Sequence, residues 1–339
     1  MDSTIFIWLA GVMLFFFPYA LTAPPEQRSI GSTTSTDLQP FQQSGTTVDA
    51  NTFTNLQLFQ RFAAAAYCSS NDNVTAGGRK LICQSGNCPL VEADGVTTVY
   101  EFENPGLLTG VTGYVAVDHA LALTVLAFRG SHTIRNWLAD LDFALIPTNI
   151  CPLCLCHQGF YNSWLEARSG VLTALKAVAS TYPTYQVVVV GHSLGGAIAD
   201  IAAAEIRKAG TNADLYTYGA PRIAGATLSN YITNQNQGRN FRTTHYDDPV
   251  PRLPPRALGF VHISPEYYID TVSGVLPTAD NITLLEGSVN LSGNTGNDRN
   301  KTDVGAHLWY FNAVSACSSN RFEFRKRGDE PSWVEGREV

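Results

Sequence analysis

The chain has 339 residues, of which 45% are hydrophobic and 15% are charged. This composition is typical of a globular protein and supports a large buried core. The formal net charge of −7 argues against a nucleic-acid partner, because proteins of that class present a basic surface.

An apolar run near the N-terminus predicts a signal peptide. Residues 5–17 are apolar, and Leu21-Thr22-Ala23 follows, so we expect residues 1–23 to be removed after Ala23. The alternative is an uncleaved membrane anchor, because residues 3–25 carry no charge. Secretion is the interpretation favoured by the cysteines and by four glycosylation sequons, at Asn73, Asn281, Asn290 and Asn300.

Residues 24–50 are rich in Pro, Ser, Thr, Gln and Gly and show little periodicity, which predicts a disordered pro-region or linker. A helix is expected after it, over residues 55–67, since its apolar residues recur on one side. Alternating or continuous apolar runs then predict three strands, at residues 97–102, 111–117 and 120–128.

Residues 132–141 form a short amphipathic segment directly after the third strand. Its apolar residues follow helical spacing i, i+3, i+4, i+7 and are Ile134, Trp137, Leu138 and Leu141. The spacing alone favours an ordinary surface helix docked on the core. The functional alternative is a lid that swings and exposes Trp137 to lipid.

A long helix is expected over residues 159–179, and the segment that follows carries the chemistry. Val187-Val188-Val189-Val190 predicts a strand buried on both faces, and residues 197–208 predict a helix. Between them lies Gly191-His192-Ser193-Leu194-Gly195, a Gly-X-Ser-X-Gly motif. Strand, sharp turn and helix together indicate a nucleophile elbow that presents the Ser193 hydroxyl.

Further strands are expected at residues 215–218 and 241–245. Strands that alternate with helices predict an α/β fold, with a mostly parallel sheet covered on both faces. Residues 272–303 are polar and rich in Gly and Asn, and residues 306–314 are rich in aromatic side chains. The charged segment 318–339 is expected to be a disordered tail, which could be processed at Arg325-Lys326-Arg327.

A serine nucleophile needs a histidine base and an acid that orients it, and in this fold the chain order is Ser, acid, His. The acid should follow the end of a strand, which selects Asp247 or Asp248 over Asp200 on the elbow helix. The histidine must follow the acid, which leaves His262 or His307. The sequence pattern does not separate the two candidates of either pair.

The oxyanion of the tetrahedral intermediate needs preset hydrogen-bond donors. One is expected to be the Leu194 N–H, immediately after the nucleophile. Ser131 follows the strand at 120–128 and offers the second, through its N–H and its hydroxyl.

The chain has seven cysteines. Cys83 with Cys88, and Cys151 with Cys154, could close local loops, while a bridge from Cys68 to Cys317 would close a very long one. Cys156 would be left over. The alternative, a zinc site at Cys-X-X-Cys-X-Cys-His 151–157, lacks a second cluster to complete a tetrahedral site, so we expect no metal.

Several motifs together resemble the filamentous-fungal class 3 triacylglycerol lipases, in register from about residue 53 to 317. They are Phe128-Arg129-Gly130-Ser131, Gly191-His192-Ser193-Leu194-Gly195-Gly196-Ala197, Tyr218-Gly219-Ala220-Pro221-Arg222, Asp248-Pro249-Val250-Pro251-Arg252-Leu253-Pro254-Pro255 and Ala306-His307-Leu308-Trp309-Tyr310-Phe311. The resemblance implies an α/β-hydrolase fold with Asp248 as the acid and His307 as the base. It also implies Ser131 and Leu194 as oxyanion residues, residues 132–141 as the lid, and the bridges Cys68–Cys317, Cys83–Cys88 and Cys151–Cys154.

The chain departs from this family pattern at four positions. Cys156 replaces a non-cysteine residue, and Pro249 stands where Ile is usual after the acid. Arg135 and Ala144 replace acidic residues in and beyond the lid. Less negative charge near the lid would ease the approach of phosphate-bearing lipids, which keeps phospholipase A1 activity open.

The sequence therefore predicts a secreted serine esterase, with its α/β-hydrolase domain at residues 51–317, that cleaves triacylglycerols at a lipid–water interface through an acyl-enzyme. Neither a metal nor another cofactor is expected, and no obligate protein partner is evident. A feruloyl-type esterase is a further alternative, although it would have a more polar lid. A lipid-binding module without activity would need a broken triad, whereas every required residue type is present.

Overall fold

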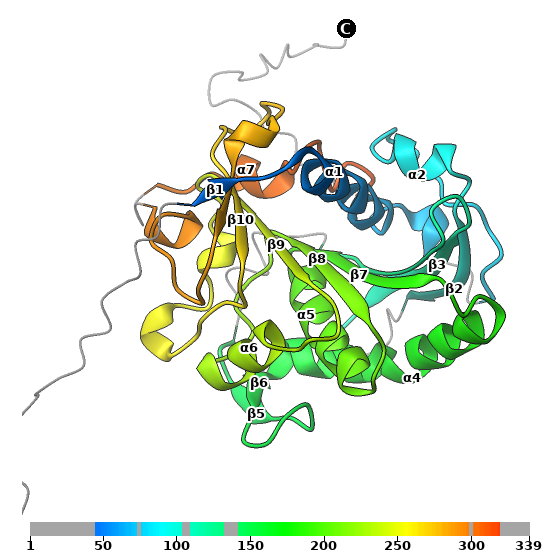
Figure 1. Cartoon of the computed structure of the whole chain (residues 1–339), viewed down its shortest axis with the longest axis horizontal. Helices are drawn as coiled ribbons and strands as arrows, with labels where there is room; N and C mark the ends of the chain where they lie inside the picture. Colours follow the sequence, from blue (N-terminus) through cyan, green and yellow to red (C-terminus); the bar gives the residue numbers. More distant parts are fainter. Residues whose placement is uncertain (1–44, 73–75, 104–108, 132–141, 298–300, 319–339) are drawn as a thin grey trace, which may run out of the picture. The chain divides into compact units, whose positions relative to one another are not determined.

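A nine-stranded sheet forms the centre of the described structure (Figure 1). The computed structural model describes residues 45–72, 76–103, 109–131, 142–297 and 301–318. The strand order is β1-β11-β10-β9-β8-β7-β4-β3-β2. The strands are Thr46–Thr47 (β1), Thr97–Glu103 (β2), Thr112–Asp118 (β3), Leu123–Phe128 (β4), Gln186–His192 (β7), Ala213–Tyr218 (β8), Asn240–His245 (β9), Glu266–Ile269 (β10) and Ile282–Leu285 (β11).

The centre of the sheet is parallel and both margins are antiparallel. Strands β4, β7, β8, β9 and β10 pair in parallel, which confirms the predicted architecture. Antiparallel pairing adds β3 and β2 at one margin, and β11 and β1 at the other. The carboxyl ends of the five parallel strands therefore share one edge of the sheet, where sites of α/β proteins lie.

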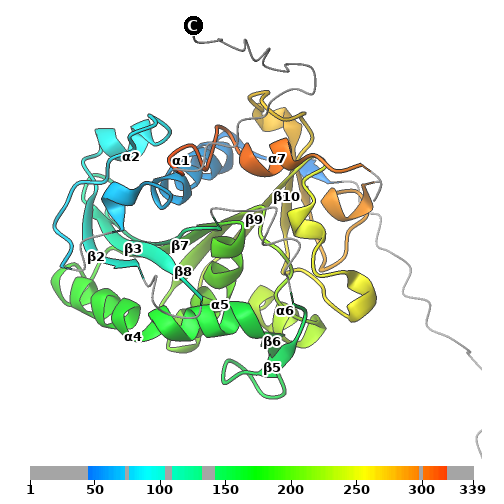
Figure 2. The same cartoon turned by 180° about the vertical axis from the view of Figure 1, so that it is seen from behind.

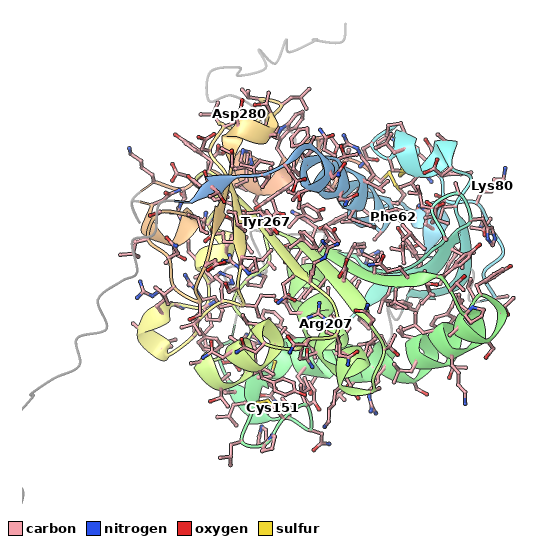
Figure 3. The ribbon with its side chains drawn as sticks, in the orientation of Figure 1. Phe62, Lys80, Cys151, Arg207, Tyr267 and Asp280 are labelled. Atoms are coloured by element: carbon pink, nitrogen blue, oxygen red, sulfur yellow. A yellow bond between two sulfur atoms is a disulfide. The ribbon has the colours of Figure 1, made fainter. Side chains whose placement is uncertain are left out.

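Helices cover both faces of the sheet (Figures 1 and 2). Helix α1 (Ala50–Ala65) packs on one face, and α4 (Gln158–Thr181) and α5 (Leu194–Lys208) pack on the other. Phe62 of α1 and Arg207 of α5 mark these opposite faces in Figure 3. Burial of both faces explains the run of valines in β7, since Val188 and Val190 face α1 while Val189 faces α4 and α5.

The remaining elements are short. They are the helices Pro89–Ala93 (α2), Ala226–Thr233 (α6) and Val304–Leu308 (α7), and the 3₁₀ turns Ser69–Asn71, Val250–Arg252, Arg256–Leu258, Ala279–Asn281 and Asn294–Gly296. A separate hairpin pairs Leu145–Pro147 (β5) with Leu155–His157 (β6). The hairpin follows the predicted lid segment in the chain.

The folded part begins earlier than the predicted boundary at residue 51. Thr46 and Thr47 pair with β11, so the end of the predicted linker belongs to the sheet. Helix α1 starts at Ala50 rather than at residue 55, because the Asp49 side chain caps it by accepting a hydrogen bond from the Thr52 N–H at 2.7 Å. In contrast, strand β4 starts three residues later than predicted, because Ala122 has a φ of 55° and belongs to the preceding turn.

Several predictions concern residues outside the described ranges. These are the signal peptide at 1–23, most of the pro-region at 24–50, the tail from residue 319 onward, and the lid at 132–141 with Ile134, Trp137, Leu138 and Leu141. They stay predictions. Within the described ranges, no helix combines the length and apolar character needed to span a bilayer.

The structure contains the three disulfide bonds that the family resemblance implies, Cys68–Cys317, Cys83–Cys88 and Cys151–Cys154. Cys156 is a free, buried thiol. Its Sγ donates to the Ile223 carbonyl at 3.5 Å, and burial raises its pKa above the usual value. A buried thiol with a raised pKa forms little thiolate, so Cys156 is a poor nucleophile towards the nearby bridge.

Candidate active site

Ser193 lies on the sharp turn between β7 and α5. Its backbone has a φ of 58° and a ψ of −130°, a strained conformation for a residue with a Cβ. The Ser193 N–H donates to the Tyr218 carbonyl at 2.9 Å, which fixes the turn to β8. A Cβ on Gly191 would overlap the Gly195 carbonyl, and a Cβ on Gly195 would overlap the Phe128 carbonyl. Both glycines are therefore required by the close approach of strand and helix.

Asp248 and His307 form a buried pair. The His307 Nδ1 lies 2.9 Å from Asp248 Oδ2 and 3.0 Å from Oδ1. Two further donors reach the same carboxylate: the Tyr310 hydroxyl donates to Oδ2 at 2.6 Å and the Val250 N–H donates to Oδ1 at 2.8 Å. An ionised carboxylate that accepts these bonds holds the imidazole with Nδ1 protonated, which leaves Nε2 as a proton acceptor.

Asp247 and His262, the other candidates for the acid and the base, have different partners. Asp247 pairs with Arg252, with 3.0 Å between Oδ1 and Nη2. His262 Nε2 lies 2.6 Å from the Pro251 carbonyl, and burial lowers the pKa of His262 well below its usual value. The structure thus brings together Asp248 and His307, the residues that the family resemblance selects, and holds Asp247 and His262 in structural contacts.

His192 joins the Asp248–His307 pair to the turn that carries Ser193. Its Nε2–H donates to the His307 carbonyl at 2.8 Å, and the two imidazole centroids are 4.6 Å apart. Its Nδ1 accepts from the Tyr67 hydroxyl at 2.6 Å. Burial lowers the pKa of His192 well below the usual range, so the ring is neutral, with one donor and one acceptor, as these two contacts require.

Two reactive atoms are left free in this arrangement. Ser193 Oγ and His307 Nε2 are both buried, and neither has a hydrogen-bond partner among the described residues. In enzyme structures without substrate, the hydrogen bond from the nucleophile to its base is often long, and it tightens when substrate binds. The structure therefore combines an oriented imidazole, which contacts the elbow turn through His192, with an unengaged hydroxyl on that turn.

The predicted oxyanion donors lie at the same place. Leu194 is the first residue of α5, where backbone N–H groups have no acceptor within the helix. Ser131 follows Gly130 at the end of β4, and a Cβ on Gly130 would lie 2.9 Å from the Ser193 Cβ. The segment that carries Ser131 thus runs beside Ser193.

Sequence reasoning missed Tyr67, Tyr310 and Asn294 as supports of the site. The Asn294 amide donates to the Asp248 carbonyl at 2.9 Å and to the Tyr246 carbonyl at 3.0 Å, which holds the acid loop in place. Tyr310 lies three residues after His307, which is the one hint the sequence offered. Tyr67 and Asn294 are far from the motifs, and no local pattern distinguishes them.

The described residues include one group of three side chains with metal-binding atoms close together, Cys68, Cys83 and Cys317. All three sulfurs belong to disulfide bonds and cannot ligate a metal as thiolates. The group therefore does not constitute a metal centre.

Asp200, excluded above as the acid, is a buried carboxyl group on α5. It is 2% exposed, and its Oδ1 has no hydrogen-bond partner in the described part of the chain. Burial raises the pKa of Asp200 to about 8, although Arg242 and Arg207 act in the opposite direction. The folded protein therefore keeps this proton up to about pH 8, whereas the unfolded chain releases it near the ordinary aspartate pKa of 3.8.

We expect Asp200 to make the protein less stable as pH rises between these two values. The folded state binds more protons than the unfolded state there, so the free energy of unfolding falls with increasing pH, by about 3–4 kcal/mol between about pH 5 and pH 8. Asp200→Asn should flatten this dependence in denaturant unfolding, whereas exposed Asp280→Asn should not. An unchanged pH dependence in Asp200→Asn would mean that Asp200 is ionised in the folded state.

Taken together, a mostly parallel sheet with helices on both faces and a serine at the strand-to-helix elbow define this protein as an α/β hydrolase. Residues 125–258 match the model of the family described as "Lipase (class 3)". The secreted mono- and diacylglycerol lipase A of Penicillium camembertii is 42% identical over 281 residues, which cover 82% of this chain and 91% of that protein. The chain belongs to the fungal class 3 lipase family, and it is accordingly a lipase.

Solved structures agree with this assignment. The mono- and diacylglycerol lipase from Aspergillus oryzae superposes with a TM-score of 0.73 at 41% identity, covering 78% of this chain and 97% of that one. A triacylglycerol lipase whose catalytic centre is described as a serine protease triad gives a TM-score of 0.71 at 27% identity, covering 80% of this chain and 99% of that one. The two comparisons cover 78% and 80% of this chain, far more than the elbow motif alone.

Proposed function

We propose that Ser193, His307 and Asp248 form a catalytic triad that cleaves carboxylic esters through an acyl-enzyme. Ser193 Oγ attacks the ester carbonyl while His307 Nε2 takes its proton, and His307 then gives that proton to the leaving alcohol. A water molecule attacks the acyl-enzyme in the same way. Asp248 orients the imidazole and stabilises its positive charge, and the Leu194 N–H with Ser131 stabilises the oxyanion.

The observation that carries this proposal is the free Nε2 of a histidine whose other nitrogen is held by a buried carboxylate, and which contacts His192, the residue that precedes a serine on a strained turn. A strained backbone conformation persists only where the surrounding structure enforces it. Such conformations are concentrated at functional sites. The triad described for the triacylglycerol lipase structure supports the same roles.

We propose acylglycerols, presented at a lipid–water interface, as the substrate. The resemblance to class 3 triacylglycerol lipases implies triacylglycerols, whereas relatives that match most of the chain are called mono- and diacylglycerol lipases. We therefore propose that mono- and diacylglycerols are the better substrates. Burial of Ser193 supports interfacial action, because substrate can reach the hydroxyl only after a rearrangement, for which residues 132–141 are the candidate lid.

Secretion is proposed on three grounds, of which two come from the sequence and its relatives. The predicted signal peptide at residues 1–23 is one, and the description of the relatives as secreted is the other. Three disulfide bonds within the described structure support an oxidising compartment.

The test compares monoolein, diolein and triolein emulsions with phosphatidylcholine and methyl ferulate, using the purified chain. We expect turnover of mono- and diolein above that of triolein, and a jump in rate as the substrate passes its solubility limit. Turnover led by phosphatidylcholine or methyl ferulate would contradict the acylglycerol assignment. Smooth saturation across the solubility limit would contradict interfacial action while leaving the triad intact.

A further inference from the structure

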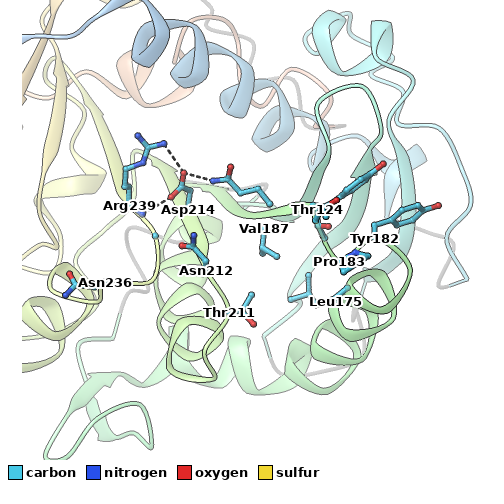
Figure 4. Close-up of a pocket in the computed structure, with 15 residues that line it drawn as sticks. Thr124, Leu175, Tyr182, Pro183, Val187, Thr211, Asn212, Asp214, Asn236 and Arg239 are labelled. Atoms are coloured by element: carbon cyan, nitrogen blue, oxygen red, sulfur yellow. Dashed lines mark hydrogen bonds and ion pairs between the residues drawn. The ribbon is translucent and has the colours of Figure 1, made fainter.

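A pocket lies at the edge of the sheet opposite to the one that carries Ser193, Asp248 and His307. It has a volume of about 850 Å³ and is lined by the first residues of β4, β7 and β8, by the end of α4, and by the segment before β9 (Figure 4). Gln186 and His192 are the two ends of β7, so the pocket and the elbow are separated by about 20 Å, from the rise of a strand. A molecule bound in this pocket would not occupy the Ser193 site.

One side of the pocket carries two tyrosines. Tyr182 and Tyr185 stack with their ring centroids 4.8 Å apart, at an interplanar angle of 20°. His119 packs edge-on against both rings and lies 2.8 Å from the Tyr185 hydroxyl through its Nδ1. These contacts hold the rings in place before any ligand arrives, and both rings stay partly exposed. A preformed aromatic surface loses little conformational entropy on binding.

The other side of the pocket is polar (Figure 4). Asp214 accepts from the Arg239 N–H at 2.8 Å and from Gln186 Nε2 at 2.9 Å, so its carboxylate is already engaged. The side chains of Asn212 and Asn236 make no hydrogen bond with any other described residue. Each of these amides therefore offers both a donor and an acceptor to a ligand.

The charges of the pocket disfavour an anion. Arg239 is the one cation among the residues that line it, and it is paired with Asp214 at 3.2 Å. Helix α4 ends at the pocket, at Thr181, without a basic residue in its last turn. The free carbonyl groups at a helix C-terminus carry partial negative charge and accept hydrogen bonds, so they suit hydroxyl donors and oppose phosphate or carboxylate.

We propose that this pocket binds a neutral oligosaccharide of hexose units. The apolar C–H face of a sugar ring stacks on the exposed part of Tyr182 and Tyr185, and its hydroxyls exchange hydrogen bonds with Asn212 and Asn236. A second hollow of about 810 Å³ adjoins the pocket and shares Asn236, Gly238 and Arg239 with it. The two hollows give room for more than one sugar unit, and their distance from Ser193 makes this an attachment site rather than a second active site.

The test measures binding of cellohexaose and laminarihexaose, with an oligogalacturonate of equal length as the anionic counterpart, by titration calorimetry. The variants are Tyr182→Leu, which removes the aromatic face, and Asn212→Ala, which removes an exposed amide. Asn51→Ala, an exposed asparagine on α1 outside the pocket, is the matched control. Melting temperature and acylglycerol hydrolysis are recorded for every protein.

We expect at least one neutral hexaose to bind the wild type and Asn51→Ala equally, and Tyr182→Leu and Asn212→Ala to weaken that binding about tenfold, the equivalent of about 1.4 kcal/mol. Hydrolysis should be unchanged in all variants. The proposal is overturned if neither neutral hexaose binds, if the oligogalacturonate binds more tightly, or if Asn212→Ala binds like the wild type. If Tyr182→Leu lowers the melting temperature, Asn212→Ala still decides, because no described side chain depends on its amide.

Discussion

Ser193→Ala is expected to lower the rate of acylglycerol hydrolysis by a factor on the order of 10⁶, because it removes the only atom that can form the acyl-enzyme in the proposed mechanism. Binding of substrate should change little, so the loss should fall on kcat rather than on KM. Initial rates on a monoolein emulsion, at matched protein concentration, measure the effect.

Substitution at the same position should also separate activity from stability. Ser193→Ala keeps a Cβ at a φ of 58°, so the backbone strain stays and the free energy of unfolding should be nearly that of the wild type. Ser193→Gly removes the Cβ and should be more stable than Ser193→Ala by about 1 kcal/mol, although it is equally inactive. Denaturant unfolding of the two variants tests this order.

Ser163→Ala is the matched control, since Ser163 is a buried serine on α4 whose hydroxyl donates to the Gly159 carbonyl at 2.9 Å. It should retain nearly full activity. If Ser193→Ala were as active as Ser163→Ala, the nucleophile would lie elsewhere in the chain.

The sequence predicted those parts of the fold whose periodicity reflects burial. The valine run of β7 is apolar at every position because helices cover both faces of the sheet, and such a run has few other interpretations. Strand β1 shows the opposite case. Thr46 and Thr47 are two threonines in a polar stretch, and only their pairing with β11 makes them a strand.

The candidate site shows a similar division. The elbow could be predicted because Gly191 and Gly195 are dictated by local sterics, which a short motif records. Asp247 and Asp248 could not be separated by spacing, because both follow the same strand. Their partners separate them: Asp247 meets Arg252, while Asp248 meets His307 from a segment 59 residues away in the chain. Contacts over such distances leave no local pattern in a single sequence.

Asp248→Asn is expected to lower kcat by a factor of about 10⁴ while preserving the fold. Every group around the carboxylate donates a hydrogen bond to it. Oδ2 accepts from Tyr310 and His307, and Oδ1 accepts from the Val250 N–H. An asparagine has one acceptor oxygen for these donors. With its NH₂ group towards His307, it forces Nδ1 to accept, which places the proton on Nε2 and removes the base. With its NH₂ group towards Val250, two donors face each other.

The neighbouring variant Asp247→Asn supplies the control, because it makes the same chemical change one residue away and affects only the contact with Arg252. Tyr310→Phe supplies an intermediate step: it removes one donor from Asp248 and should cost about tenfold in kcat. Initial rates of the three variants on a monoolein emulsion measure these losses. Equal losses in Asp247→Asn and Asp248→Asn would contradict Asp248 as the acid of the triad, because the two side chains share their position in the chain but not their partners.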